Sequence, residues 1–281
     1  MKRAIDTGEI REAVKNLLMD VNYRLSPDVA KAITSAEKAE KSELGKKVLG
    51  TLTENLRVAD EEQIPICQDT GMAVVFLDIG QDVQLMGEYL EDAVNSGVRE
   101  AYTEGYLRKS VVSDPIERKN SGDNTPAIIH TRIVKGNEVT ITVAPKGFGS
   151  ENMSRIFMLK PAQGIEGVKE AVLETVKAAG PNACPPFVVG VGIGGDFEES
   201  ALMAKRALTR EIGSHSEVAW AADLEKELLE EINSLGIGPA GLGGSVTALA
   251  VHIIPYATHI AGLPVAVNMC CHVDRHGKVT L

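Results

Sequence analysis

Four cysteines occur in three segments whose neighbouring residue types suit metal chemistry. Cys67 lies in Ile-Cys-Gln-Asp-Thr-Gly, Cys184 in Ala-Cys-Pro-Pro, and the adjacent Cys270 and Cys271 in Asn-Met-Cys-Cys-His. Each segment borders a β-rich run, and loops at strand ends are where α/β proteins place functional residues. Each segment also has a structural interpretation, because polar residues stabilise turns and buried cysteines behave as small apolar side chains.

If the three turns converge, their thiols suit an iron–sulfur cluster better than zinc. Zinc sites usually contain a close Cys-x-x-Cys pair and four ligands, and that spacing is absent. A [4Fe–4S] cube usually takes four thiolates, so three would leave one iron open to water or substrate. An open iron is a Lewis acid that polarises a hydroxyl leaving group. This predicts addition or loss of water on a small hydroxy acid, with a non-catalytic thiol or zinc protein as the alternative.

Two glycine-rich segments add further candidates. The segment that begins at Lys146, Lys-Gly-Phe-Gly-Ser-Glu, has the pattern of a capped helix start, where backbone N–H groups bind carboxylate or phosphate. Gly190, Gly192 and Gly195 match G-x-G-x-x-G between an expected strand and an expected helix. That match favours a nucleotide-binding oxidoreductase, with Glu211 as the nearest acidic residue for a ribose. Close packing of the strand on the helix would explain the same glycines.

The composition narrows the class of protein. The chain has 281 residues, 44% of them hydrophobic and 24% charged, which is typical of a soluble globular protein. A net charge of −10 and the lack of a basic stripe argue against a nucleic-acid partner. No apolar run approaches the ~20 residues of a membrane span, and the first residues lack a signal segment. We therefore expect no membrane partner, a cytoplasmic location and reduced cysteines.

Alternating apolar patterns predict an α/β fold with mixed sheets flanked by helices and a helical N-terminal region. The first helix is expected around residues 10–21, and Ser26-Pro27-Asp28 has the pattern of a cap before the second. Further helices are expected over 42–56, 85–107, 163–179, 197–209 and 218–234, and strands over 72–79, 187–193, 245–254 and 264–268.

Residues 127–134 and 138–144 flank Lys135-Gly-Asn, a pattern that predicts a hairpin. Residues 1–281 are expected to form one domain, with two possible lobes over about 1–121 and 122–281, divided at the Gly- and Pro-containing junction near residue 121.

The remaining polar residues of note lie in the second half of the chain, apart from His130. His130 and His252 fall within expected strands and are interpreted as structural. His259 lies in the turn between two expected strands, which is a better position for a functional side chain. The charged run from Glu225 to Glu231 is interpreted as the solvated face of a helix.

Taken together, these segments resemble the iron–sulfur (class I) fumarate hydratases and their relatives, the L-tartrate dehydratases, over nearly the whole chain. The motifs that carry the resemblance are Cys67-Gln-Asp-Thr-Gly, Leu107-Arg-Lys-Ser, Gly122-Asp-Asn-Thr-Pro-Ala, Gly147-Phe-Gly-Ser-Glu-Asn-Met-Ser, Ala183-Cys-Pro-Pro, Leu235-Gly-Ile-Gly-Pro-Ala-Gly-Leu-Gly-Gly and Val267-Asn-Met-Cys-Cys-His. As an ordered set they are highly specific.

The resemblance implies a site and a cofactor. It implies a [4Fe–4S] cluster with one iron that no cysteine binds, held by Cys67, Cys184 and Cys271, with Cys270 as the runner-up for the third position. It also implies that Asp69 is catalytic. The residues implied to bind substrate are Gln68, Arg108, Gly149 and His259.

The resemblance also implies a reaction and a partner. The reaction favoured is reversible hydration of fumarate to L-malate, and the alternative is dehydration of L-tartrate. Single-chain members carry a further C-terminal domain, so this chain is expected to be the α subunit of a two-subunit form within a higher oligomer. Only Arg108 has a clear cationic role for a dicarboxylate substrate, so a β subunit is expected to supply the other positive groups.

Overall fold

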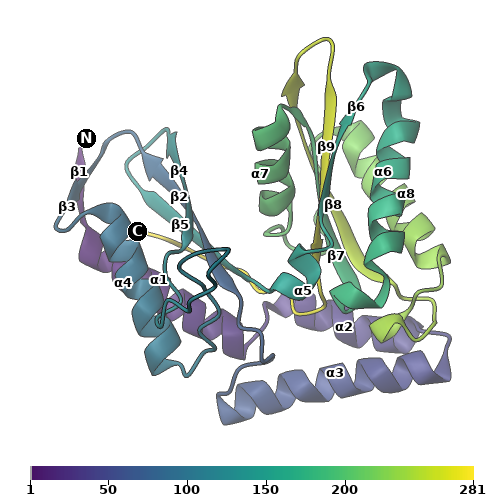
Figure 1. Ribbon diagram of the computed structural model, residues 1–281, viewed down its shortest axis with the longest axis horizontal. Coiled ribbons are helices and arrows are strands. Elements are labelled where there is room, and N and C mark those ends of the chain that lie inside the picture. The colour runs from purple at the N-terminus through teal and green to yellow at the C-terminus, as the bar shows by residue number, and fades with distance from the viewer. Residues whose placement is uncertain (1) are drawn as a thin grey trace. The chain divides into compact units, whose positions relative to one another are not determined.

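A computed structural model describes residues 2–281 of the chain (Figure 1). It has an α/β architecture with mixed sheets and a helical N-terminal region, which confirms the predicted fold class. The chain forms two compact units, each built from separate segments. The first unit comprises Met1–Ser26, Val58–Phe148 and Arg275–Leu281, and the second comprises Pro27–Arg57 and Gly149–Asp274. None of the helices in residues 2–281 combines the length and apolar character that a membrane span requires.

The first unit is centred on a four-stranded mixed sheet with the order β10-β5-β2-β4. Its strands are β2 (Met72–Gly80), β4 (Ile128–Val134), β5 (Val139–Lys146) and β10 (Gly277–Thr280). A separate parallel pair consists of β1 (Arg3–Asp6) and β3 (Val83–Met86). Helices α1 (Thr7–Tyr23) and α4 (Leu90–Glu104) pack on the four-stranded sheet, because their apolar faces share one buried core with β2 and β5.

Two predictions for this unit are wrong. The strands of the predicted hairpin do not pair with each other, because β2 lies between them, parallel to β4 and antiparallel to β5. The turn signal at Lys135-Gly-Asn correctly predicts a chain reversal, but the buried strand β2 takes the central position in the sheet. The helix expected over residues 85–107 begins only at Leu90, because the preceding residues pair with β1 as strand β3.

The two units also differ from the lobes predicted to meet near residue 121. Residues 122–148 belong to the first unit, since β4 and β5 complete the sheet around β2. The last residues return to the same sheet as β10, which pairs with β5. The division of the chain into two units is therefore decided by pairing between strands that are distant in sequence. The local composition near residue 121 does not indicate this division.

The second unit contains the other mixed sheet, with the order β6-β9-β7-β8. Its strands are β6 (Arg155–Leu159), β7 (Phe187–Gly195), β8 (Ala248–Thr258) and β9 (Leu263–Cys270). Helices α6 (Gly164–Ala179) and α8 (Ala219–Ser234) cover one face and share its apolar core, and α7 (Phe197–Ala207) covers the other (Figure 1). Short helical turns occur at Phe148–Glu151 (α5), Pro161–Gln163, Gly180–Ala183 and Pro239–Gly241.

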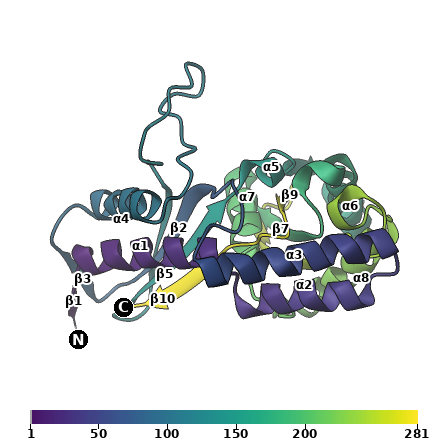
Figure 2. The ribbon, with the colours of Figure 1, turned by 90° about the horizontal axis from the view of Figure 1, so that it is seen from below.

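Helices α2 (Pro27–Ala39) and α3 (Glu43–Glu62) run side by side (Figure 2). The residues of α3 from Val58 onward are assigned to the first unit. Glu40, in the turn between them, is 2% exposed. Its carboxylate accepts hydrogen bonds from the N–H groups of Lys41, Ser42, Ser245 and Val246 at 2.7–3.0 Å. Burial by itself raises the pKa of Glu40, but these hydrogen bonds and one from the Ser245 hydroxyl outweigh it and lower the pKa to about 2. Glu40 therefore joins this turn to the glycine-rich loop before β8.

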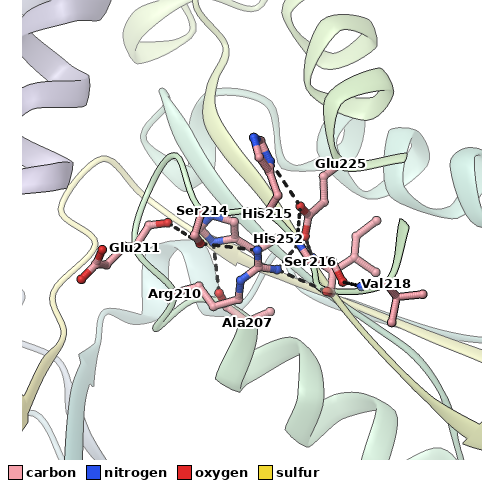
Figure 3. Close-up of polar contacts among 10 residues, drawn as sticks. Ala207, Arg210, Glu211, Ser214, His215, Ser216, Val218, Glu225 and His252 are labelled. Atoms are coloured by element: carbon pink, nitrogen blue, oxygen red, sulfur yellow. Dashed lines mark hydrogen bonds and ion pairs between the residues drawn. The ribbon is translucent and has the colours of Figure 1, made fainter. Parts of the chain in front are cut away.

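The prediction that the charged run from Glu225 to Glu231 forms a solvated face of α8 is wrong for Glu225. Glu225 is 3% exposed, and its carboxylate accepts hydrogen bonds from Arg210 at 2.6 Å, from the Ile253 N–H at 2.7 Å and from the Ser216 N–H at 3.0 Å (Figure 3). These contacts hold the loop between α7 and α8 against β8. His252 is buried beside them, with Nδ1 3.1 Å from the carbonyl oxygen of residue 207, which confirms its structural interpretation.

Candidate active site

The turn from Cys67 to Gly71 precedes the central strand of the first unit and is held on several sides. The Ile66 N–H donates to the backbone oxygen of Asn22, at the end of α1, at 2.9 Å. The Tyr102 hydroxyl on α4 lies 2.7 Å from the Thr70 oxygen and 2.9 Å from the Gly71 oxygen. Tyr102 is 1% exposed, and burial raises the pKa of its hydroxyl, so it remains protonated and donates. The turn is therefore rigidly positioned by α1 and α4.

Two other motifs of the resemblance contact this turn. The Thr70 hydroxyl donates to the backbone oxygen of Arg108 at 3.1 Å, which brings the segment of Arg108 beside the turn. Asn124, from the Gly-Asp-Asn-Thr-Pro motif, is fully buried; its Nδ2 donates to the Gly71 oxygen at 3.2 Å and its Oδ1 accepts from the Ser110 N–H at 2.7 Å. The side chain of Arg108 is itself exposed and accessible to a ligand.

Asp69 has both carboxylate oxygens oriented by backbone donors. Oδ1 accepts from the Gly71 N–H at 3.0 Å, and Oδ2 accepts from the Phe148 N–H at 3.0 Å. The glycine segment after β5 therefore lies directly against Asp69. Asp69 is half-buried and its neighbour Gln68 is exposed, so both can reach a ligand in the first unit.

Sequence analysis missed two buried cations of this unit. Arg275 is 3% exposed, and its Nη1 donates to Asn22 Oδ1 at 2.9 Å. Lys146 is 5% exposed, and its Nζ donates to the Gly147 oxygen at 3.2 Å. Lys146 begins a motif that was singled out for its glycines, and Arg275 lies four residues after Cys271. Their local sequence gives no sign that the fold buries them.

Cys184 and Cys271 lie at one end of the sheet in the second unit. Cys184 follows the Gly180–Ala183 turn with a φ of 53°, and its carbonyl oxygen accepts from the His272 N–H at 3.3 Å. Because β7 and β9 are antiparallel, the start of β7 and the end of β9 meet at this edge, where Val188 pairs with Cys270. Cys184 is exposed and Cys271 half-buried.

The two adjacent cysteines differ in burial and in their surroundings. Cys270 is 4% exposed and packs in an apolar cluster with Val188, Leu208 and Ala250. Cys271 follows the last residue of β9 and is more accessible. This supports Cys271 over Cys270 as the third metal ligand, because a thiol packed among apolar side chains is poorly placed to bind a cluster.

Gly149 lies near the same end of the second unit, and His259 does not. A Cβ on Gly149 would lie 3.7 Å from the Asn182 oxygen, beside the Cys184 segment. His259 is exposed in the turn between β8 and β9, one residue after Thr258, which pairs with Gly195 at the far end of β7. The strand β7 separates His259 from Cys184, so no contact within this unit supports a shared site, and its substrate contact stays a prediction.

The thiols present fit a three-thiolate cluster in their chemistry. Cys67 belongs to the first unit, and Cys184 and Cys271 belong to the second. None of the four cysteines, all within the described residues, forms a disulfide. Neither unit alone, over residues 2–281, gathers three His, Cys, Asp or Glu side chains that could hold a metal ion.

The G-x-G-x-x-G segment serves helix packing. A Cβ on Gly190 would lie 2.2 Å from the Ala204 oxygen, and a Cβ on Gly192 would lie 2.0 Å from an oxygen of the same helix, so α7 packs directly on the β7 backbone. The Asp196 side chain caps α7 and accepts from the Glu198 and Glu199 N–H groups. A pyrophosphate at this helix start would meet carboxylates, so the nucleotide-binding alternative has no support here.

Comparisons with known proteins agree with the motifs. The model of the "Fumarate hydratase (Fumerase)" family matches residues 11–280. The "Putative L(+)-tartrate dehydratase subunit alpha" of Methanocaldococcus jannaschii is 44% identical over 274 residues, which cover 95% of each chain. The "L(+)-tartrate dehydratase subunit alpha" of Escherichia coli K12 is 35% identical over 275 residues, 97% of this chain and 90% of that relative. The chain therefore belongs to the family of class I fumarate hydratase α chains and L-tartrate dehydratase α subunits.

Proposed function

We propose that this protein is the α subunit of an L(+)-tartrate dehydratase, which removes water from L(+)-tartrate to form oxaloacetate. The observation that carries the proposal is the agreement of two relatives, 44% and 35% identical over at least 95% of this chain, whose names both give that activity and subunit. Sequence analysis favoured fumarate and held tartrate as the alternative, and the comparisons favour the alternative. Fumarate hydration remains the second candidate because the matching family model carries that name.

We propose that Cys67, Cys184 and Cys271 hold a [4Fe–4S] cluster with one iron that no cysteine binds. The family to which the chain belongs uses an iron–sulfur cluster, and the thiols at these three turns suit one. When bound, such a cluster supplies Lewis acidity at the hydroxyl that leaves. The burial of Cys270 supports its exclusion from the ligand set.

The proposed roles of the other residues follow from their placement. Asp69, with its two oxygens oriented by backbone N–H groups, assists removal of the proton from the carbon next to a carboxylate. The exposed Arg108 guanidinium and the Gly149 N–H hold the substrate carboxylates, since charge-assisted hydrogen bonds are strong and directional. Gln68, beside Asp69, contributes a polar contact. His259 stays a predicted substrate contact without support from its own unit.

The relatives are named as α subunits, so we propose a β subunit as partner and a higher oligomer as the working assembly. The β subunit would supply the base that Asp69 assists and further cations for a dicarboxylate substrate. Turnover by the cluster-loaded α subunit alone would contradict this part of the proposal.

The test is a substrate comparison on the complex purified without oxygen with its β subunit. We expect about four iron and four sulfide per α chain, and a kcat/KM for L(+)-tartrate at least ~10-fold above that for L-malate or fumarate, a difference of ~1.4 kcal/mol in transition-state stabilisation. A preference for fumarate would replace the tartrate assignment with the second candidate. A complex with full cluster that neither dehydrates L(+)-tartrate nor interconverts fumarate and L-malate would refute both.

The ligand set has its own test with a matched control. Cys271→Ser is expected to lower bound iron well below that of the wild type, whereas Cys270→Ser is expected to leave it unchanged because its side chain packs in an apolar cluster. The reverse result would make Cys270 the third ligand.

A further inference from the structure

We propose that Arg275 is a positioning residue of the active site, whose buried guanidinium supplies the positive charge against which the Asp69 carboxylate keeps its orientation. The inference rests on the proposed function for its catalytic meaning, because that function assigns proton transfer to Asp69. The placement of the two charges rests on the first unit alone, to which both residues belong.

Arg275 is a buried charge with few partners. It is 3% exposed, and its one hydrogen bond within the described residues runs from Nη1 to Asn22 Oδ1 at 2.9 Å. Its Nε is buried with no acceptor, and the described residues provide no ion pair for it. A guanidinium cannot give up its proton in a protein. Burial of such a charge destabilises the fold unless a nearby anion compensates it.

Asp69 is the anion that the structure places beside it. A Cβ built on Gly147 would lie 3.1 Å from Asp69 Oδ2 and 3.6 Å from Arg275 Nη2. The two charged atoms therefore lie within ~7 Å of each other, less than the Debye length of ~8 Å at physiological ionic strength. A pair of opposite charges at this separation, one buried and one half-buried, attracts without direct contact, because the protein interior screens it less than water does.

Tyr102 gives a second indication that the charges of Arg275 and Asp69 lie close to each other. Burial is the main reason that its pKa is raised, but the charge of Arg275 lowers that pKa and the charge of Asp69 raises it. The same hydroxyl bonds the backbone at Thr70 and Gly71, directly after Asp69. The two charges therefore act on one buried hydroxyl at the turn.

Asn22 fixes Arg275 relative to the turn. Its side chain accepts from Arg275, and its backbone oxygen accepts from the Ile66 N–H at 2.9 Å, one residue before Cys67. Asn22 is fully buried, and its Nδ2 is bonded to the Leu18 oxygen within α1. The guanidinium is thus held in place by the same helix end that holds the turn, and its field on Asp69 is preorganised.

The test compares Arg275→Met, which removes the charge at similar length, with Arg275→Lys, which keeps it. Arg132→Met is the matched control, since Arg132 is an exposed arginine of the same unit that pairs with Asp78 at 2.8 Å. Hydrogen exchange is measured on the α–β complex in peptides covering residues 67–72 and 146–149, which contain the two amides bonded to Asp69. Kinetic constants and bound iron are measured on the same samples.

We expect exchange at these peptides to be on the order of tenfold faster in Arg275→Met, near wild type in Arg275→Lys and unchanged in Arg132→Met. We expect kcat to fall between ~10- and 100-fold in Arg275→Met, with KM within ~3-fold of wild type, unchanged iron and partial recovery in Arg275→Lys. If Arg275→Met does not fold, the Lys variant decides: wild-type exchange supports the proposal, and faster exchange overturns it.

Other outcomes overturn the proposal. Unchanged exchange at both peptides in a folded Arg275→Met complex would show that Asp69 does not depend on this charge. Faster exchange across the whole first unit, with no recovery in Arg275→Lys, would show a purely structural role. If exchange responds as expected but the wild-type complex neither dehydrates L(+)-tartrate nor hydrates fumarate, the proposed function fails and the positioning of Asp69 by Arg275 stands.

Discussion

Glu40 gives the sharpest prediction about stability. We expect Glu40→Gln to destabilise the second unit by ~3 kcal/mol at pH 7. The pKa of Glu40 falls from 4.5 to about 2 on folding, and each pKa unit corresponds to ~1.4 kcal/mol. The glutamine side chain cannot replace the carboxylate, because its NH₂ group would face backbone N–H donors that in the wild type donate to a carboxylate oxygen.

The sign of the pH dependence follows from the depressed pKa. The ionised carboxylate stabilises the folded state fully above the unfolded pKa of ~4.5, and that contribution is lost as pH falls from there toward about 2. The wild type should therefore lose part of this free energy between pH 5 and pH 3. Glu40→Gln cannot titrate at this position, so its stability should lack that component.

Urea unfolding followed by the fluorescence of Trp220, the single tryptophan, reports on the second unit. Glu43→Gln is the matched control, since Glu43 lies three residues away with an 83% exposed side chain paired to Lys46, and it should cost no more than ~0.5 kcal/mol. A loss below ~1 kcal/mol for Glu40→Gln with an unchanged m-value, or the same pH dependence as wild type, would refute the reasoning.

Three other predictions follow from single contacts. Asp69→Asn should keep the cluster's iron but lower kcat of the complex by ~10²-fold or more; a wild-type kcat would remove Asp69 from the mechanism. Gly192→Ala should destabilise the chain by ~2 kcal/mol or more, because its Cβ would lie 2.0 Å from a backbone oxygen of α7. Gly262→Ala is the control and should be near neutral in the same unfolding assay, because no atom lies nearer than 3.8 Å to its Cβ. Arg210→Met should cost ~3–5 kcal/mol, because the Glu225 carboxylate stays buried without its arginine partner and with only the more distant His215 as a possible cation. Part of the loss should be recovered when Glu225→Leu is added, and a loss below ~1 kcal/mol for the single variant would show that the pair is not coupled.

The predicted elements match the structure best where periodicity is local. The helices predicted around residues 10–21, 163–179 and 218–234 correspond to α1, α6 and α8, each of which buries apolar side chains on one face. The strand predicted over 72–79, a β-rich run that ends at Gly80, corresponds to β2. The pattern failed where neighbours in the sheet come from elsewhere in the chain. The strands β4 and β5 carry a hairpin signal, yet both pair with β2, and the two compact units interleave.

The order of motifs by itself determined the family, because seven short segments in a fixed order are specific even though each one has an ordinary structural interpretation. It also placed Gln68, Asp69 and the segment of Arg108 in one region, which the contacts of Thr70 and Asn124 explain. Only the tertiary structure decided that Cys270 packs in an apolar cluster while Cys271 does not, that Glu225 is buried, and that Arg275 lies beside Asp69. The physical reason is that burial and electrostatic environment depend on residues distant in sequence, whereas helix periodicity and turn chemistry are set by neighbours along the chain.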